Sequence, residues 1–210
     1  MSFKKNVLSL LSLIVLTSFN SYALSINDLI DDAKKVISPE NKESSEVITN
    51  KVSENSDSKI AIGFSPEGSA QNAIIDLINS AQRQIRVAAY SFTSPVIVKS
   101  LIRAKQRGID VRIVVDENGN KSKSSVAAMS LVKSAKIPLR TISKYAIHHD
   151  KFIVVDGESV ETGSFNYSSS ANSKNSENAI VLYNMPQVAK PYLSHWESRW
   201  QEGTDWQLSY

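Results

Sequence analysis

Short apolar segments alternate with helix-like segments along most of the chain, from Lys59 onward. Short apolar runs are typical of β-strands, whereas apolar residues that recur every three or four positions are typical of amphipathic helices. One further helix is predicted to begin after Ser94. This order favours an α/β sandwich with a mixed, mostly β sheet core flanked by helices. The strands are predicted at residues 60–64, 85–89, 109–115, 152–155, 159–162 and 179–183, and the other helices at residues 70–81, 124–136 and 188–200.

Residues with special backbone preferences support these boundaries. Ser94 can cap a helix whose first residue is Pro95, and Gly108 suits the C-terminal end of that helix. Asp156 opens an Asp-Gly-Glu sequence between two strand segments, a pattern typical of a β-hairpin. We therefore interpret Asp156 as structural, because aspartates in turns commonly accept hydrogen bonds from the backbone.

The first 23 residues have the features of a secretory signal peptide. Lys4 and Lys5 form a basic start, residues 7–19 are mostly apolar, and Ser21-Tyr22-Ala23 has the small-x-small form of a cleavage site. The apolar run is shorter than the ~20 residues that span a bilayer, which favours cleavage over the alternative, an uncleaved anchor. We predict a periplasmic or secreted protein with no stable membrane association after cleavage.

Composition divides the remaining chain into two parts. Residues 24–58 are polar and contain no aromatic residue, which indicates a linker. Residues 59–210 form the predicted domain and hold 18 basic and 13 acidic residues, a net charge of +5. This charge is compatible with a polyanionic partner, but mildly basic domains are also common. The absence of cysteine excludes disulfides, a thiolate zinc site and a cysteine nucleophile.

Two short patterns contain the residue types needed for phosphodiester chemistry. The first is H-x-K-x4-D, with His149, Lys151 and Asp156, and the second is G-S-x-N, with Ser164 and Asn166. Side chains two positions apart in an extended segment lie on the same face. Each pattern therefore presents two polar groups together. An imidazole, an ammonium, a hydroxyl and an amide suit the charge and acceptor oxygens of a phosphodiester.

Each of these groups has a chemical role available to it. The imidazole of His149 can attack phosphorus to give a phosphohistidine intermediate. Lys151 can neutralise the non-bridging oxygens, to which Ser164 and Asn166 can donate hydrogen bonds. Glu177 can accept a hydrogen bond from the other imidazole nitrogen and so fix the tautomer of the ring.

These patterns resemble the phospholipase D superfamily, whose signature is an H-K-D motif with a downstream G-S-x-N. The likeness covers residues 59–202 and is closer to the small single-motif members, which are exported bacterial endonucleases. It implies a phospholipase D-like sandwich with His149 as nucleophile and Glu177 as the residue that orients it. It also implies phosphate binding by Lys151, Ser164 and Asn166. Further segments that look like this group are Tyr90–Ser94, Arg107–Arg112 and Asn175–Asn178.

The chain contains a single H-x-K pattern. Hydrolysis through a covalent intermediate needs one group that attacks phosphorus and another that protonates the leaving oxygen. A twofold dimer would place a second His149 opposite the first, and the resemblance implies the same homodimer with one shared site. No cofactor is expected. Metal-independent catalysis is predicted, because H-x-H and H-E-x-x-H patterns are absent and Lys151 can supply the positive charge.

Other candidate residues receive different interpretations. His148 is predicted to face away from His149, and His195 to be a partly buried residue of the last helix. Phe92 could stack on a base, but packing in the core is the preferred interpretation. Basic residues within 121–144 could follow a nucleic-acid backbone or simply face solvent.

The leading hypothesis is an exported endonuclease that hydrolyses phosphodiester bonds, mainly of DNA. Little sequence preference is expected, because the identified groups address phosphate rather than base edges. The alternatives are a phospholipase D-type phosphodiesterase acting on lipid headgroups and a noncatalytic DNA-binding module. The complete set of catalytic residues argues against the module, and the lack of an evident apolar docking segment argues against the lipid enzyme.

Overall fold

The computed structural model of the protein describes residues 57–207. The signal peptide predicted at residues 1–23 and nearly all of the linker predicted at 24–58 lie outside the described residues. Both therefore stay predictions, as does the N-terminal boundary of the domain. Among the described helices, none combines the length and the apolar character that a bilayer span requires.

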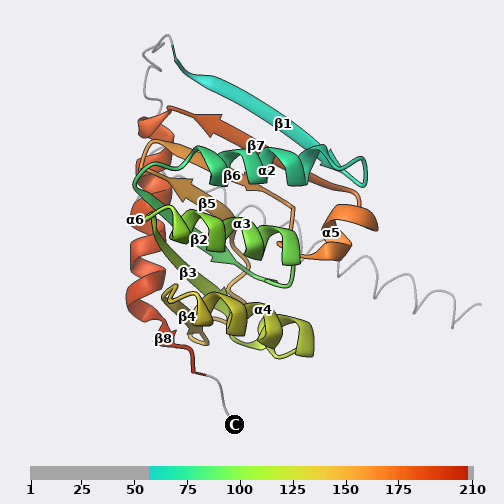
Figure 1. The fold of residues 1–210 in the computed structure, drawn as a ribbon, viewed down its shortest axis with the longest axis vertical. Coiled ribbons are helices and arrows are strands. Elements are labelled where there is room, and N and C mark those ends of the chain that lie inside the picture. Colours follow the sequence, from blue (N-terminus) through green and yellow to red (C-terminus); the bar gives the residue numbers. More distant parts are fainter. Residues whose placement is uncertain (1–56, 208–210) are drawn as a thin grey trace, which may run out of the picture. The chain divides into compact units, whose positions relative to one another are not determined.

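An eight-stranded sheet forms the centre of the domain (Figure 1). Its spatial order is β1-β7-β6-β5-β2-β3-β4-β8. The β2–β3 and β3–β4 pairs are parallel, and the other neighbouring pairs are antiparallel, so the sheet is mixed. The strands are β1 (Lys59–Ser65), β2 (Gln84–Ala89), β3 (Asp110–Asp116), β4 (Leu139–Ile142), β5 (Lys151–Val155), β6 (Ser159–Gly163), β7 (Glu177–Tyr183) and β8 (Thr204–Asp205).

Helices cover both faces of this sheet. Figure 1 shows α2, α3 and α4 side by side on one face, and α6 lies on the other. Each face has its own apolar core. The arrangement confirms the predicted α/β class, a mixed sheet flanked by helices. The helices are α2 (Ser69–Ser80), α3 (Pro95–Gln106), α4 (Lys123–Ser134), α5 (Ser169–Ser173) and α6 (Pro186–Glu202), with a short 3-10 turn η1 (Asn118–Asn120).

Successive side chains of β5 point to opposite faces of the sheet. Ile153 and Val155 pack beneath α2, α3 and α4, whereas Phe152 and Val154 pack beneath α6. Trp196 of α6 anchors this second core, and its Nε1 donates a hydrogen bond to the backbone oxygen of Val87 at 2.9 Å. The apolar stripe predicted for the last helix therefore lies against the sheet.

Local signals in the sequence correctly mark the start and end of α3. The Ser94 hydroxyl accepts a hydrogen bond from the backbone N–H of Ile97, and Pro95 is the first helical residue. Gly108 follows the helix with a φ of 91°, a left-handed conformation that glycine adopts without steric cost.

Four short elements are absent from the sequence predictions. These are β4, β8, the five-residue helix α5 and the 3-10 turn η1. β4 contains Arg140 and Thr141 in a run of only four residues, so its apolar pattern is weak. Arg140 Nε lies 2.7 Å from Asp205 Oδ1, which joins β4 to β8. Such long-range contacts, rather than local propensity, stabilise both strands.

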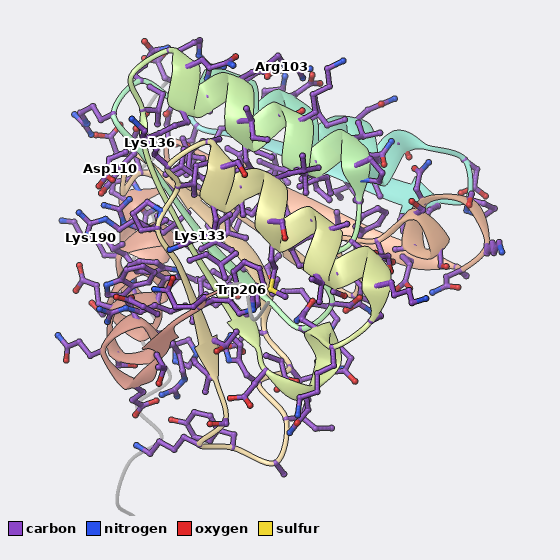
Figure 2. All side chains as sticks on the ribbon, turned by 60° about the horizontal axis from the view of Figure 1, so that its bottom comes forward. Arg103, Asp110, Lys133, Lys136, Lys190 and Trp206 are labelled. Carbon is purple, nitrogen blue, oxygen red and sulfur yellow. The ribbon has the colours of Figure 1, made fainter. Side chains whose placement is uncertain are left out.

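The basic residues within 121–144 belong to several elements, among them α4, β4 and the loops that flank them. Lys133 and Lys136 lie at the C-terminal end of α4, on the side of Figure 2 opposite α5. Lys144 is ion-paired with Glu202 at 2.7 Å. The interpretation as solvated side chains therefore fits this stretch better than a groove wall.

Candidate active site

Strand topology gathers the predicted site residues at one end of the sheet. His149 and Lys151 lie at the start of β5, Ser164 follows the last residue of β6, and Glu177 is the first residue of β7. β5, β6 and β7 are antiparallel neighbours. The start of β5 therefore lies level with the end of β6 and the start of β7.

The exposed side chain of His149 contacts both Lys151 and Tyr90. His149 Nδ1 lies 3.2 Å from Lys151 Nζ, and the His149 ring centroid lies 4.6 Å from that of Tyr90. Because an ammonium can only donate, Nδ1 accepts this hydrogen bond. The proton of a neutral ring then sits on Nε2. Attack by Nε2 requires a ring whose proton sits on Nδ1 instead. Nδ1–H then needs a hydrogen-bond acceptor, a role that the ammonium of Lys151 cannot fill.

The ammonium of Lys151 is buried beneath the imidazole. Its Nζ also donates to the backbone oxygen of His149 at 2.9 Å and lies 5.4 Å from the centroid of the Tyr90 ring. Burial lowers the pKa of Lys151, while the carboxylates of Glu177 and Asp150 act in the opposite direction. A buried cation at the floor of an open site gains most from an anionic ligand such as a phosphodiester.

The structure gives Glu177 other partners than the one predicted. Its Oε2 accepts a hydrogen bond from Ser164 Oγ at 2.6 Å, and its Oε1 accepts one from Asn175 Nδ2 at 2.8 Å. Ser164 Oγ in turn accepts from the backbone N–H of Asn178 at 3.0 Å. No recorded hydrogen bond joins Glu177 to His149 among the described residues. The role of Glu177 as the acceptor that orients His149 stays a prediction.

Asn166 follows Ser164 by two positions, at the same end of the sheet. Its Oδ1 is buried and has no hydrogen-bond partner in the part of the chain that the structure describes. Buried polar atoms almost always have a partner, but this oxygen can only accept, so it has room for a donor and not for a phosphate oxygen. The phosphate-binding role of Asn166 stays a prediction.

Tyr90 is a site residue that the sequence patterns do not single out. It directly follows β2, and its backbone oxygen accepts a hydrogen bond from Asn120 Nδ2 at 2.7 Å. It belongs to the family-like segment Tyr90–Ser94, at the end of a predicted strand, and strand ends in α/β folds often border the ligand crevice. The neighbouring Phe92 is fully buried, which agrees with the packing interpretation.

The two histidines left out of the predicted site lie close to it. Asp150 Oδ2 lies 2.8 Å from His195 Nε2 and 3.5 Å from His148 Nδ1. Burial lowers the pKa of His148, against the opposite influence of Asp150. The side chain of His195 is 40% exposed and lines the same hollow as His149. His195 is thus a partly buried residue of the last helix, as expected, and it also lines the hollow beside His149.

Asp156 lies at the opposite end of β5 from Lys151. Its carboxylate accepts hydrogen bonds from the backbone N–H groups of Gln82, Arg83 and Gln84 at 2.8 to 2.9 Å. It adopts a left-handed φ of 57° in the β5–β6 turn. Asp156 thus joins the β5–β6 hairpin to the loop that precedes β2. The sequence suggested a hydrogen bond within the turn itself, so the observed partners lie farther away along the chain.

Replacing Asp156 by alanine is expected to lower the free energy of unfolding by about 2 kcal/mol, because three backbone donors lose a charged acceptor. Urea titration measures this loss. The matched control is Glu158→Ala in the same turn, which removes an exposed ion pair with Arg83 and is expected to cost less than about 1 kcal/mol. Turnover per folded molecule is expected to persist in both variants. A catalytic loss as severe as that of His149→Ala would overturn the structural assignment.

Two hollows flank the imidazole of His149. The larger, of about 440 Å³, is bounded by β5, β6 and α6, and the smaller, of about 150 Å³, is bounded by residues 145–150 and α6. Both share His149, Asp150 and His195. A third hollow of about 760 Å³ surrounds the Asp156 turn at the far end of β5 and contains none of the predicted catalytic groups.

The described residues contain no group of three or more histidine, aspartate or glutamate side chains placed to hold a metal ion. Lys151 supplies a positive charge beside His149, and the guanidinium of Arg199, which is ion-paired with Glu202, lines the smaller hollow. The chemistry available here is nucleophilic attack by an imidazole on an anion held by cations and hydrogen-bond donors.

Comparisons with known proteins agree with this site. The family model described as "Cardiolipin synthase, PLD-like domain" matches residues 74–200. The crystal structure of Nuc from Salmonella typhimurium, a phospholipase D family member, is 50% identical, has a TM-score of 0.71, and covers 72% of this chain and 99% of that chain. "Phospholipase D" from Rickettsia conorii is 34% identical over 148 residues, 70% of this chain and 72% of that protein.

A more distant relative is "Mitochondrial cardiolipin hydrolase" from Xenopus tropicalis, which is 30% identical over 134 residues, 64% of this chain and 62% of that protein. The family match covers more than half of the chain and includes His149, Lys151, Ser164, Asn166 and Glu177. The resemblance inferred from the sequence motifs is thereby confirmed. The chain belongs to the phospholipase D superfamily and is a phosphodiesterase of that superfamily.

Proposed function

We propose that this protein is an exported endonuclease that hydrolyses nucleic-acid phosphodiester bonds, mainly of DNA. The observation that carries the proposal is the 50% identity to Nuc over 99% of the Nuc chain, together with the resemblance of the H-K-D and G-S-x-N patterns to single-motif bacterial endonucleases. The N-terminal signal pattern supports a periplasmic or secreted location.

The reaction begins when His149 Nε2 attacks phosphorus and forms a P–N bond. The bond from phosphorus to one ester oxygen breaks, and a second imidazole gives this oxygen a proton. The same group then removes a proton from water, which attacks phosphorus and releases His149. Lys151, Ser164 and Asn166 hold the non-bridging oxygens throughout. Glu177 accepts a hydrogen bond from Nδ1–H of His149 and so stabilises the positive charge that the ring gains.

The proposed site recognises phosphate and sugar-phosphate charge rather than base edges. The groups identified for substrate binding, Lys151, Ser164 and Asn166, are of kinds that donate to phosphate oxygens, and phosphate contacts carry no sequence information. Little sequence preference follows.

A homodimer supplies the second imidazole, because the chain has one H-x-K pattern. An exposed apolar surface on β1 supports such a partner. Ile60, Ile62 and Phe64 are 53%, 62% and 55% exposed. Gly63 closely approaches Ala70 of α2, so these three side chains occupy the other face of the edge strand. Apolar side chains that are more than half exposed in a row are typical of an interface.

A lipid substrate is the second candidate, favoured by the names of two relatives, "Phospholipase D" and "Mitochondrial cardiolipin hydrolase". The same covalent chemistry would cleave a lipid phosphodiester. Experiment has to separate the two substrate classes, because the phosphate-binding residues serve both equally well.

Purified protein is expected to nick and then degrade plasmid DNA in buffer that contains EDTA, because Lys151 and the hydrogen-bond donors supply the charge stabilisation. Agarose electrophoresis follows the DNA. Release of choline from phosphatidylcholine vesicles and formation of phosphatidic acid from cardiolipin vesicles are measured in parallel. His149→Ala is the control for contaminating nucleases.

Each other outcome of this experiment contradicts a defined part of the proposal. Cleavage that stops in EDTA and returns with Mg²⁺ contradicts metal-independent catalysis. Hydrolysis of vesicles without hydrolysis of DNA makes the protein a lipid phosphodiesterase. DNA binding without cleavage of either substrate indicates a noncatalytic module.

A further inference from the structure

The hollow of about 440 Å³ beside His149 is a feature that the proposed reaction does not use. It lies on the α6 side of the sheet, where Pro191, Tyr192 and His195 form one wall. His149 and Lys151, at the start of β5, also line it. A group attached to a phosphate held at His149 therefore lies beside this hollow.

The walls of the hollow are fixed by contacts within the protein. The Tyr192 ring packs edge-on against Phe152, with ring centroids 5.1 Å apart and an angle of 70° between the planes. His195 Nε2 is held by Asp150 Oδ2 at 2.8 Å. Tyr192 is only partly buried, so a face of its ring remains accessible beside the hollow. A preformed aromatic wall binds a flat ligand without a further cost of ordering the side chain.

We infer that this hollow binds the nucleoside next to the scissile phosphate, with its base stacked against Tyr192. The inference rests on the proposed nuclease function. The volume of the hollow falls in the range of small-molecule sites. Its mixture of an aromatic wall with the Thr162 hydroxyl suits a planar base attached to a hydroxylated sugar. Stacking accepts every base, so the subsite strengthens binding without adding sequence specificity.

The charge and size of the hollow favour a nucleoside over the parts of a phospholipid. Its cationic or potentially cationic groups are His149, Lys151 and His195, and its one carboxylate, Asp150, is already paired with His195. A choline group carries positive charge, which Lys151 disfavours, whereas a nucleoside carries none. The two long acyl chains of a diacylglycerol exceed the space of one hollow of about 440 Å³.

The test uses a short DNA tetramer whose central linkage is a normal phosphodiester and whose other linkages are uncharged methylphosphonates. Three forms are compared: one with all bases, one without the base 5′ to the cleavable bond, and one without the base 3′ to it. KM and kcat are measured for wild-type protein, Tyr192→Ala and Tyr192→Phe. Thermal melting of each variant reports whether the packing against Phe152 survives.

With wild-type protein, removal of one of the two flanking bases is expected to raise KM about tenfold, which corresponds to ~1.4 kcal/mol. With Tyr192→Ala, removal of that same base is expected to change KM less than about twofold, because its stacking partner is gone. Tyr192→Phe keeps the ring and is expected to restore the sensitivity to the base. The ratio of KM values with and without the base is taken for each protein separately, so a variant that is merely less stable gives the same ratio as wild-type protein.

Equal effects of base removal on wild-type protein and Tyr192→Ala would overturn the subsite while leaving the nuclease function intact. Failure of wild-type protein to cleave both the tetramer and plasmid DNA would remove the proposed function itself. If Tyr192→Ala instead impairs hydrolysis of cardiolipin vesicles and leaves DNA cleavage unchanged, the hollow serves a lipid and the inference is wrong.

Discussion

Alanine at position 149 is expected to lower kcat/KM for DNA by roughly 10⁴-fold or more, because it removes the nucleophile of a covalent mechanism. The fold is expected to persist, since the His149 side chain is exposed and its ring hydrogen-bonds only to Lys151 among the described residues. Initial rates of plasmid nicking measure the loss, and thermal melting measures the stability. A variant that retains more than about a hundredth of the activity would rule out His149 as the nucleophile.

The same substitution tests whether two chains share one site. Wild-type and His149→Ala chains with different affinity tags are co-expressed, and the mixed dimers are isolated. A shared site needs both imidazoles, so mixed dimers are expected to have less than about a tenth of wild-type activity. Half of the wild-type activity per dimer would contradict the shared site. It would point to a complete site in one chain, with His195 as a second imidazole beside the same hollow.

Local patterns in the sequence predict most of the fold and the shared face of neighbouring polar side chains. The i, i+2 spacing of His149 and Lys151 directs both side chains to one side of β5 and leaves Asp150 and Phe152 on the α6 side. Ser94 and Gly108 mark helix ends through local hydrogen bonding and local backbone geometry. Such features depend on a few neighbouring residues, so a sequence contains all the information they need.

Contacts between distant segments are the part that the sequence does not disclose. The pairing of Asp150 with His195 spans 45 positions, and the Asp156 carboxylate binds backbone groups 72 to 74 positions away. Glu177 binds Ser164, a competing partner that the motif alone does not reveal. In each case the strand order brings the groups together, and strand order follows from the packing of the whole sheet rather than from any one segment.

Wild-type protein is expected to lose stability as pH rises from 4.5 to 8 because of one buried carboxyl group, Glu161. This residue of β6 is fully buried, and burial raises its pKa from 4.5 to about 8, although a 2.7 Å hydrogen bond from the Tyr167 hydroxyl opposes the shift. Below pH 4.5 the group is protonated in both the folded and the unfolded chain. Between these values only the unfolded chain ionises, so the free energy of unfolding falls by on the order of 4 kcal/mol across the window.

Glu161→Gln removes this titration while keeping the shape of the side chain. The difference in unfolding free energy between wild-type protein and Glu161→Gln, measured by urea titration from pH 4 to 9, is expected to rise in favour of the variant up to about pH 8 and then level off. A cost of burying the amide that does not depend on pH shifts the whole difference curve and leaves its slope unchanged. Tyr167→Phe removes the opposing hydrogen bond and is expected to move the upper end of the window to higher pH. A difference curve that stays flat would show that Glu161 titrates normally in the folded protein. Because Glu161 pairs with Ile153 of β5, ionisation of this carboxyl would weaken the hairpin that holds Lys151 and Ser164 at the site.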